Sequence, residues 1–197
     1  MAILLSDKRI REYVEKHKMI DNFSEKVKKE GLFSYGLGSF GYDARLSGKY
    51  SILSLDTLKR LGMSLDTKDQ QVMNMFQGIS EVAGKITIPA RSVALLALVE
   101  TFNMPNNVQA YSHFGKSSYA RAGIIPNICP IDAGYSGAIS FSVNNLTDVP
   151  IVLYAYEGIA QISFWAEDDD CEGSYAVDGK YMGSEGLTIP KFNGILE

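Results

Sequence analysis

The chain has 197 residues, of which 46% are hydrophobic and 21% are charged, and these values are ordinary for a single soluble globular domain. Its formal net charge is -4 and its pI is about 5.3, which argues against a protein that binds nucleic-acid backbones through a basic surface. The charge balance therefore excludes nucleic acid as a partner, but a local cluster of Lys and Arg can still bind a small anion.

Targeting signals and disulfide patterns are missing from the sequence. The N-terminal apolar run, Ala2–Leu5, is far shorter than the core of a signal peptide. No stretch approaches the ~20 apolar residues that a membrane span needs. Cys129 and Cys171 are too few and too far apart for a disulfide framework. We therefore expect a cytoplasmic protein with free thiols and no membrane contact.

The first predicted element is a short helix that begins after Ser6, a residue typical of N-caps. One apolar stripe at helical spacing follows, made of Ile10, Tyr13, Val14 and His17. Residues 24–30 (SEKVKKE) form a charged stretch that we expect to be exposed. The glycine-rich segment 31–41 predicts turns and close backbone approach rather than a helix.

Residues 55–80 are expected to form a variable insertion, with one or two helical turns that end at Gly62. From Ile86 onward, short apolar runs alternate with turn residues. The predicted strands are 92–101, 124–128, 138–144, 151–156 and 159–165. Short strands at this spacing are typical of a sandwich, jelly roll or barrel. Residues 171–197 have no periodicity and are expected to form a flexible tail or lid on one domain that spans residues 1–197.

Two segments carry the residue types that bind a nucleotide. GKSSYARAG (115–123) places two hydroxyls and two cations within a short turn or helix, as a polyphosphate requires. PIDAGYSG (130–137) is a hairpin with a carboxylate that can accept from a sugar hydroxyl and an aromatic ring that can pack on the sugar. Each segment alone is equally compatible with an ordinary polar turn.

Together with three further motifs, these segments resemble the dCTP deaminase family of the dUTPase superfamily. SYGLGSFGYDAR (34–45) is similar to the family's SYGLSSYGYDIR, and GKSSYARAGI (115–124) is similar to its GKSTYARCGI. YEGIAQISF (156–164) resembles NEGIAQVLFF. The C-terminal stretch that contains GKY (179–181) and GLTIP (186–190) resembles GKYQGQQGVTLP. The resemblance covers most of the chain except residues 50–85.

The resemblance implies a mainly β fold, a distorted jelly-roll or β-barrel of the dUTPase-like type, in a homotrimer with active sites between subunits. It implies a pyrimidine deoxynucleoside triphosphate as ligand, with Mg²⁺ bound through the triphosphate rather than by protein side chains. Lys116, Ser117, Ser118 and Arg121 would hold the phosphates and order the site, Asp132 would meet the 3′-hydroxyl, and Tyr135 would contact the sugar. From the tail, Tyr175 and Lys180 would contact phosphates, and Ser184 stands where the family has a ligand-binding Gln.

The catalytic position departs from the family. Deamination without zinc needs a general acid–base, which the family supplies as the Glu of GHVTLEFSN. The aligned stretch here is GAISFSVNN (137–145), and Ser142 occupies the Glu position. Strand alternation places Ala138, Ser140 and Ser142 on the ligand face and Ile139, Phe141 and Val143 on the core face. We predict Ser117, Arg121 and Ser142 as the catalytic group, and Ser140 and Phe141 as further residues of the nucleotide site.

Three hypotheses follow. The chain is a dCTP deaminase in which another group, such as Glu172, Glu185 or a water held by Ser142, replaces the missing carboxylate. Alternatively, it is a dUTPase-like hydrolase that uses Mg²⁺, or a nucleotide-binding protein without turnover. A modified pyrimidine substrate is a variant of the first two. No zinc is expected, because the H-x-E and P-C-x-x-C signature of zinc deaminases is absent.

Overall fold

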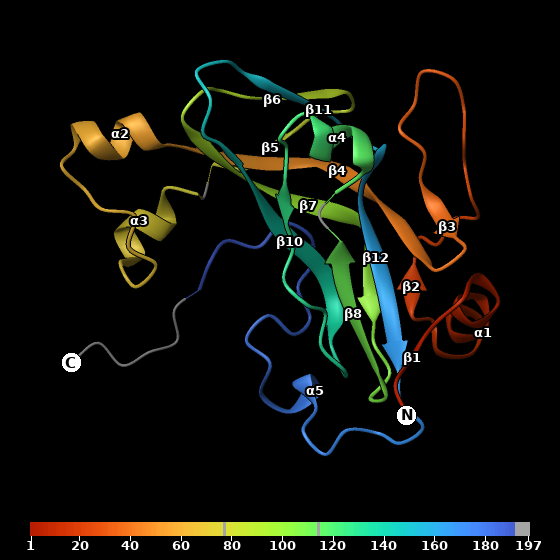
Figure 1. The fold of residues 1–197 in the computed structure, drawn as a ribbon. Coiled ribbons are helices and arrows are strands. Elements are labelled where there is room, and N and C mark those ends of the chain that lie inside the picture. Colours follow the sequence, from red (N-terminus) through yellow and green to blue (C-terminus); the bar gives the residue numbers. More distant parts are fainter. Residues whose placement is uncertain (77, 114, 192–197) are drawn as a thin grey trace.

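The computed structural model describes residues 1–76, 78–113 and 115–191 and shows a strongly curved antiparallel β-structure with five short helices in this part of the chain (Figure 1). The strands are β1 (Ile3–Leu4), β2 (Ile20–Asp21), β3 (Gly36–Gly38), β4 (Gly41–Ser54), β5 (Ser80–Glu81), β6 (Lys85–Ile88), β7 (Ser92–Asn103), β8 (Val108–His113), β9 (Pro126–Asn127), β10 (Ser136–Asn145), β11 (Ile151–Tyr154) and β12 (Gly158–Ala166). The helices are α1 (Asp7–His17), α2 (Leu55–Arg60), α3 (Gln70–Asn74), α4 (Ser117–Arg121) and α5 (Tyr175–Asp178).

The long strand β4 joins the two halves of the main sheet, whose strand order is β1-β12-β4-β7-β10-β9. Its first residues pair with β12, with Tyr42 opposite Ile162. Its later residues pair with β7, with Leu53 opposite Val93, and the register shifts between Leu46 and Tyr50. Because one strand serves both halves across an irregularity, the sheet curls instead of lying flat. The predicted mainly β, jelly-roll-like fold is confirmed.

The prediction of turns for the glycine-rich segment was only partly correct, because strand β4 begins at Gly41, the last residue of that segment. Gly41 has a φ of +136°, and a Cβ there would lie 2.7 Å from the carbonyl oxygen of Ile162. A side chain would therefore force the start of β4 away from the middle of β12. The turns that the glycines predict are present, but a strand of 14 residues follows them without a break.

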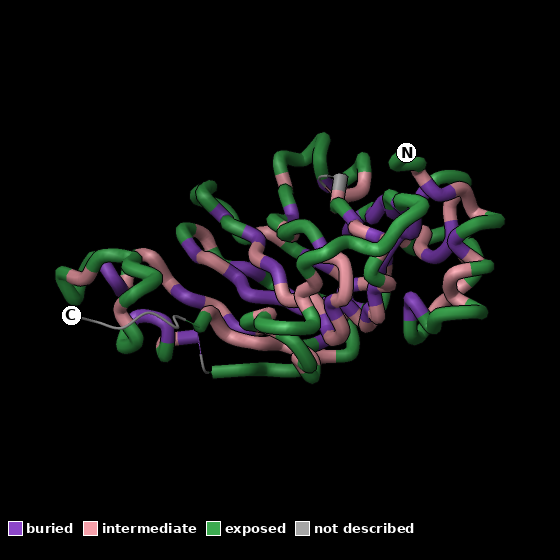
Figure 2. The backbone as a smooth tube through the Cα atoms, turned by 90° about the horizontal axis from the view of Figure 1, so that it is seen from below, coloured by how far each residue is buried: buried purple, intermediate pink, exposed green. Residues whose placement is uncertain are grey.

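Buried residues gather in the interior of the molecule, while exposed residues lie mainly on its outer loops (Figure 2). The core contains Tyr42, Leu96, Phe102, Phe141 and Phe164, each no more than 2% exposed. Packing at this depth supplies most of the stabilisation that holds the curled sheet together.

The core also holds a carboxylate, Glu100, which is fully buried. It accepts hydrogen bonds from Arg45 Nε at 2.8 Å, from the Arg45 backbone N–H at 2.9 Å and from the Tyr42 hydroxyl at 3.1 Å. Burial raises the pKa of Glu100, and the bonds from Arg45 offset part of that rise. The network ties β7 to β4 at the point where β4 passes from one half of the sheet to the other.

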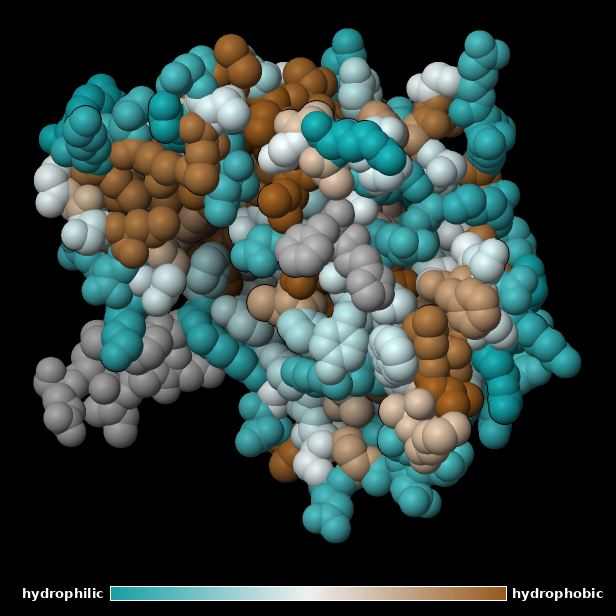
Figure 3. Space-filling model, in the orientation of Figure 1, coloured by the Kyte–Doolittle hydropathy of each residue, from teal (hydrophilic) through white to brown (hydrophobic). Residues whose placement is uncertain are grey.

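The helices have separate roles. Helix α1 forms where predicted and buries Ile10, while His17 at its end is exposed. Helices α2 and α3 project from the sheet and share a small core of their own, centred on Leu58, Val72 and Met73. Apolar side chains gather over these two helices at the upper left of Figure 3. The predicted insertion at 55–80 thus follows directly after β4 and contains a helical module.

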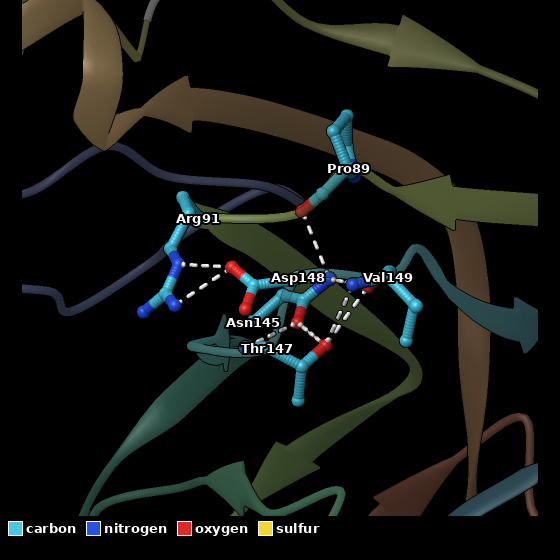
Figure 4. A network of polar contacts seen from close by, with 6 residues as sticks. All are labelled: Pro89, Arg91, Asn145, Thr147, Asp148 and Val149. Carbon is cyan, nitrogen blue, oxygen red and sulfur yellow. Dashed lines mark hydrogen bonds and ion pairs between the residues drawn. The ribbon is translucent and has the colours of Figure 1, made fainter.

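The turn after β10 is fixed by the buried side chain of Asn145 (Figure 4). Its Nδ2 donates to the carbonyl oxygens of Pro89 at 2.9 Å and Val149 at 2.8 Å. Its Oδ1 accepts from the Thr147 hydroxyl at 2.8 Å. Asp148 of this turn forms an exposed ion pair with Arg91, which lies in the neighbouring turn between β6 and β7. These bonds fix where β10 ends. They therefore fix the register of the strand that carries Ser140, Phe141 and Ser142, which were predicted as residues of the nucleotide site.

The C-terminal segment lies against the start of β10. The N–H of Ala138 donates to the Ser184 carbonyl oxygen at 2.8 Å, and the N–H of Gly183 donates to the Ser136 carbonyl oxygen at 2.8 Å. Leu187 and Ile189 pack against the small core of α2 and α3. The tail up to residue 191 is therefore ordered against its own chain, and the remainder of the predicted lid, residues 192–197, lies outside the described residues.

Candidate functional site

Two cavities collect most of the residues to which the motifs point. The first, which we call the lysine cavity, has a volume of about 410 Å³ and is lined by Lys28, Lys29, Ser34, Lys116, Ser117 and Ser118, among others. The second, the hairpin cavity, has a volume of about 310 Å³ and is lined by Asp132, Tyr135, Ala138, Ser140, Tyr175 and Ser184, among others. Both volumes fall in the range of small-molecule sites.

The lysine cavity is built around the ammonium group of Lys116. Lys116 is the N-cap residue of α4, and its side chain makes no capping hydrogen bond. Lys116 Nζ donates to Asp43 Oδ2 at 2.9 Å and to Ser34 Oγ at 3.1 Å, and its side chain is only 14% exposed. Lys26 contacts the same Asp43 oxygen at 2.5 Å. The carboxylate is thus shared by two cations, and Ser117 and Ser118 present their hydroxyl-bearing side chains beside them. Ammonium and hydroxyl donors around one hollow can bind phosphate oxygens.

Arg121 is not part of the lysine cavity in the described structure. It ends α4, is exposed, and its Nη1 donates to the backbone oxygen of Ser117 at 3.2 Å. The guanidinium therefore closes the short helix in this chain, and its predicted contact with phosphate stays a prediction.

The hairpin cavity has a rigid floor made by Tyr135. Its hydroxyl donates to the Ala138 carbonyl oxygen at 2.6 Å, and its ring meets the Tyr175 ring edge-on at 5.5 Å. Burial raises the pKa of Tyr135 to about 12, so the phenol stays protonated at neutral pH. Asp132 Oδ1 accepts from Gln109 Nε2 at 2.9 Å, which fixes the carboxylate at the cavity wall.

The predicted alternation along β10 is wrong at its first positions, because the register shifts between Ala138 and Ser140. Ile139 consequently lines the hairpin cavity beside both of them instead of facing only the core. The Phe141 side chain is buried in the core, 2% exposed, so only its backbone remains for a ligand. Ser142 is half-buried between β7 and β9 and lies outside the described lining of both cavities.

The tail residues lie near the hairpin rather than near the lysine cavity. Ser184 lines the hairpin cavity, and its hydroxyl donates to the Tyr181 carbonyl oxygen at 2.7 Å. Ser140 Oγ accepts from the Thr188 N–H at 2.8 Å, so the tail occupies a polar group of β10. Lys180 is exposed, with its ammonium nitrogen 5.5 Å from the centre of the Tyr181 ring.

A third hollow, of about 740 Å³, lies between the tail and the end of β12. Its lining includes the carboxylates of Asp132, Glu167, Asp169, Asp170 and Asp178, and no lysine or arginine among the described residues. Negative charge of this density repels a polyphosphate, so this third hollow is not the place for one.

Within one chain, the predicted phosphate-binding residues and the predicted sugar-binding residues therefore lie in separate cavities. The cavity of Lys116, Ser117 and Ser118 shares no described lining residue with the cavity of Asp132 and Tyr135. Sequence reasoning missed three residues of the first cavity. Asp43 was contained in a quoted motif without a role, and Lys28 and Lys29 were taken as part of an exposed charged stretch. Consecutive lysines before a glycine turn were the available signal.

Fold and cavities define a jelly-roll protein with a cationic, serine-lined hollow. Residues 4–166 match the family described as dCTP deaminase-like. The dCTP deaminase of Campylobacter fetus subsp. fetus is 40% identical over 189 residues, which cover 95% of this chain and 97% of that protein. The dCTP deaminase of Rhizorhabdus wittichii is 38% identical over 190 residues, covering 95% and 98%. The chain belongs to the dCTP deaminase-like family.

A solved structure shares the fold. The crystal structure of 2′-deoxycytidine 5′-triphosphate deaminase from Agrobacterium tumefaciens superposes with a TM-score of 0.58 at 19% identity. The match covers 84% of this chain and 48% of that one, so the chain spans about half the length of that protein.

The described residues were also compared with the requirements of a metal site and of a membrane span. Within the described ranges, no group of three or more His, Cys, Asp or Glu side chains is arranged to hold a metal ion. Among the same residues, no helix has both the length and the apolar character that crossing a bilayer requires.

Proposed function

We propose that this chain binds a pyrimidine deoxynucleoside triphosphate and catalyses the hydrolytic deamination of dCTP, or of a modified dCTP, to the corresponding dUTP and ammonia. The observation that carries the proposal is the match to proteins named dCTP deaminase along 95% of the chain. The lysine cavity supports it, because its donors suit a polyphosphate, and the Asp132–Tyr135 hairpin suits a deoxyribose.

The proposed site is shared between neighbouring chains of a homotrimer. This arrangement is supported by the separation of the two cavities within one chain, since a single nucleotide needs both phosphate and sugar contacts. Lys116, Ser117 and Ser118 of one chain would hold the phosphates, with Arg121 at the end of the same helix. Asp132 and Tyr135, contributed by another chain, would hold the sugar. Saturable nucleotide binding that disappears on dilution to the monomer is the expected behaviour.

Mg²⁺ is proposed to arrive on the triphosphate. The donors of the lysine cavity are ammonium and hydroxyl groups, and its one carboxylate, Asp43, already contacts Lys26 and Lys116. This donor set suits the phosphate oxygens and not the cation itself. Mg²⁺ would therefore be held by the phosphate oxygens and by its own waters, and it would neutralise part of the polyphosphate charge. We place the protein in the cytoplasm, a proposal that the exposed free thiols of Cys129 and Cys171 support.

Ser142 determines how fast the reaction can run. Water attack at C4 of cytosine requires removal of a proton from the water and delivery of a proton to the departing ammonia. A serine hydroxyl does not exchange protons at neutral pH as a carboxylate does, and loss of a general acid–base typically lowers a rate by ~10²–10⁴-fold. We therefore expect deamination to be slow compared with that of a relative that has Glu at this position.

A second candidate function is nucleotide binding without deaminase turnover. The observation that favours it is the lining of the hairpin cavity, in which Asp132 is the single carboxylate among the described residues. Gln109 already holds that carboxylate, and the proposal assigns it to the sugar. A dUTPase-like hydrolase, the third possibility, would direct water at the α-phosphate with the help of Mg²⁺.

One assay separates these functions. The protein is incubated with dCTP and with dUTP in the presence of Mg²⁺, and ammonia, pyrophosphate and bound nucleotide are each measured. Ammonia from dCTP supports the deaminase. Pyrophosphate from dUTP without ammonia supports the hydrolase, and saturable binding with neither product supports the binding protein. Absence of binding to either nucleotide overturns all three.

The variant Ser142→Glu tests the role of the missing carboxylate. We expect it to release ammonia from dCTP at least about tenfold faster than the parent protein, because it restores a group that can exchange protons. Ser142→Gln is the matched control, since it has the same length but cannot act as an acid or a base. Equal rates for the Glu and Gln variants would show that the chemistry does not depend on position 142.

A further inference from the structure

The lysine cavity has a second wall that no motif includes. It is formed by the loop between β2 and β3, and Lys28, Lys29 and Ser34 of this loop line the cavity opposite Lys116 and its two serines. Lys28 and Lys29 are exposed, whereas the Lys116 side chain is largely covered. The two loop lysines therefore stand at the outer rim of the same hollow.

The loop is held in place at its base and at its turn. Val27 and Tyr35 form an antiparallel bridge, with N–H to carbonyl oxygen distances of 2.8 and 3.1 Å. The N–H of Leu32 donates to the Lys29 carbonyl oxygen at 3.3 Å, and Gly31 supplies the positive φ of +78° that this turn requires. The position of both lysines is thus set by backbone bonds on either side of them.

The loop is also fastened to the elements that carry the phosphate motif. The Phe33 ring stacks on the Tyr119 ring of α4, with centroids 4.5 Å apart. The Phe33 N–H donates to Glu157 Oε2 at 2.7 Å, and the Gly158 N–H donates to the Phe33 carbonyl oxygen at 3.1 Å. The loop and α4 therefore form one unit, and Lys28 and Lys29 keep a fixed relation to Ser117 and Ser118.

The charges of the cavity are not balanced within the chain. Asp43 is the single acidic residue in its described lining, and it is already shared by Lys26 and Lys116. Across residues 1–76, 78–113 and 115–191, no ion pair joins Lys28 or Lys29 to a carboxylate. Two exposed cations on an anchored loop, without a counter-charge and at the rim of a hollow lined with hydroxyls, suit a ligand with several negative charges.

We propose that Lys28 and Lys29 bind the outer phosphates of the nucleotide and make the site selective for a triphosphate over a monophosphate. The inference rests on the proposed function and adds to it two binding residues outside the four motifs. Lys116, deeper in the cavity, holds the phosphates nearer the sugar, and the rim lysines hold the phosphates farther from it. A monophosphate, which ends before the rim, does not use them.

The test measures binding rather than turnover, so that it does not depend on Ser142. Dissociation constants for dCTP and dCMP with Mg²⁺ are compared between the parent protein, Lys28→Gln/Lys29→Gln and Lys28→Arg/Lys29→Arg. The Gln variant should bind dCTP about tenfold more weakly and dCMP within about twofold of the parent, and its salt dependence should be shallower. The Arg variant keeps both charges and should bind dCTP close to the parent value.

The matched control is Lys8→Gln/Lys16→Gln, which removes the same charge from exposed positions of α1. If the Lys28/Lys29 and Lys8/Lys16 variants bind dCTP equally well, or if dCMP weakens as much as dCTP, the loop lysines are not a triphosphate site. If the parent protein binds neither dCTP nor dUTP, the proposed function itself has failed, and this inference fails with it.

Discussion

Replacing Arg45 by methionine should destabilise the protein through the buried carboxylate of Glu100. Methionine keeps much of the apolar bulk of the arginine stem but removes the guanidinium, whose Nε lies 2.8 Å from Glu100 Oε1. Glu100 would keep its bonds from the backbone N–H at position 45 and from the Tyr42 hydroxyl, at 2.9 and 3.1 Å. Neither remaining donor carries a charge, so the carboxylate would stay buried without a counter-ion.

The expected cost follows from this geometry. Glu100 is 0% exposed, and removal of one partner from a buried ion pair typically costs about 3–5 kcal/mol. A domain has about 5–15 kcal/mol in total, so the loss is a large fraction of its stability. With a urea slope of about 2 kcal/mol/M, a loss of about 4 kcal/mol moves the unfolding midpoint by about 2 M.

The loss should depend on pH. The pKa of Glu100 is raised above 4.5 in the folded protein, and loss of Arg45 raises it further, so the native state binds this proton more tightly than the unfolded chain. Stability of the variant should therefore fall as the pH rises above 4.5. The deficit should shrink between pH 7 and pH 5 and should largely disappear in Arg45→Met/Glu100→Gln.

Urea denaturation of the three proteins at pH 5 and pH 7, at one protein concentration, measures these differences. A fixed concentration is needed because self-association would shift the midpoint. A loss below about 1 kcal/mol at pH 7, or an equal loss at both pH values, would contradict the assignment of Glu100 as a buried carboxylate that depends on Arg45.

Two more predictions concern the cavities. Tyr135→Phe should cost about 1 kcal/mol in urea at pH 7, because it removes a buried hydrogen bond to a β10 carbonyl. Folding raises the pKa of Tyr135 from 10 to about 12, so the parent protein should lose stability as the pH rises between these values. The Phe variant has no phenol at this position and should not show this loss. A difference in unfolding free energy between the two proteins that stays constant over this pH range would refute the burial argument. Gly158→Ala should weaken dCTP binding about tenfold, because a Cβ there would lie 2.1 Å from the Ser34 carbonyl oxygen at the lysine cavity. Gly173→Ala, where a Cβ meets nothing within 4 Å, is the control, and equal dCTP affinity in the two variants would contradict this prediction.

Local sequence patterns were sufficient to predict the elements that have a clear cap or a clear apolar periodicity. Helix α1 formed where Ser6 and the apolar stripe placed it, and β7 and β12 formed where apolar runs lie between turn residues. Strand β8 was missed because its sequence, VQAYSH, contains no apolar run longer than two residues. Strand β4 was missed because it starts in the glycine-rich segment, which predicts turns, even though Asp43 and Arg45 alternate with apolar residues as in a strand. These charges are tolerated inside because partners from other elements, Lys116 and Glu100, lie beside them.

The candidate site was predicted only in part, for related reasons. The motifs identified Lys116, Ser117, Asp132 and Tyr135, and their types indicated the ligand before any geometry was known. The position of Ile139 could not be foreseen, because a register shift between strands leaves no mark in the alternation of a single strand. Residue roles carried over from the family, including that of Ser142, stay predictions.

The sequence by itself determined the fold class, the family and the chemistry of the phosphate and sugar segments, because these depend on residue types at short spacing along the chain. Tertiary structure decided which of these segments share a cavity within one chain. It separated Lys116 from Asp132, and it brought Lys28 and Lys29, about 90 residues away in sequence, to the hollow beside Lys116. Contacts of this kind arise from strand pairing and ring stacking between distant segments, and short-range sequence patterns carry no information about which distant segment will be the partner.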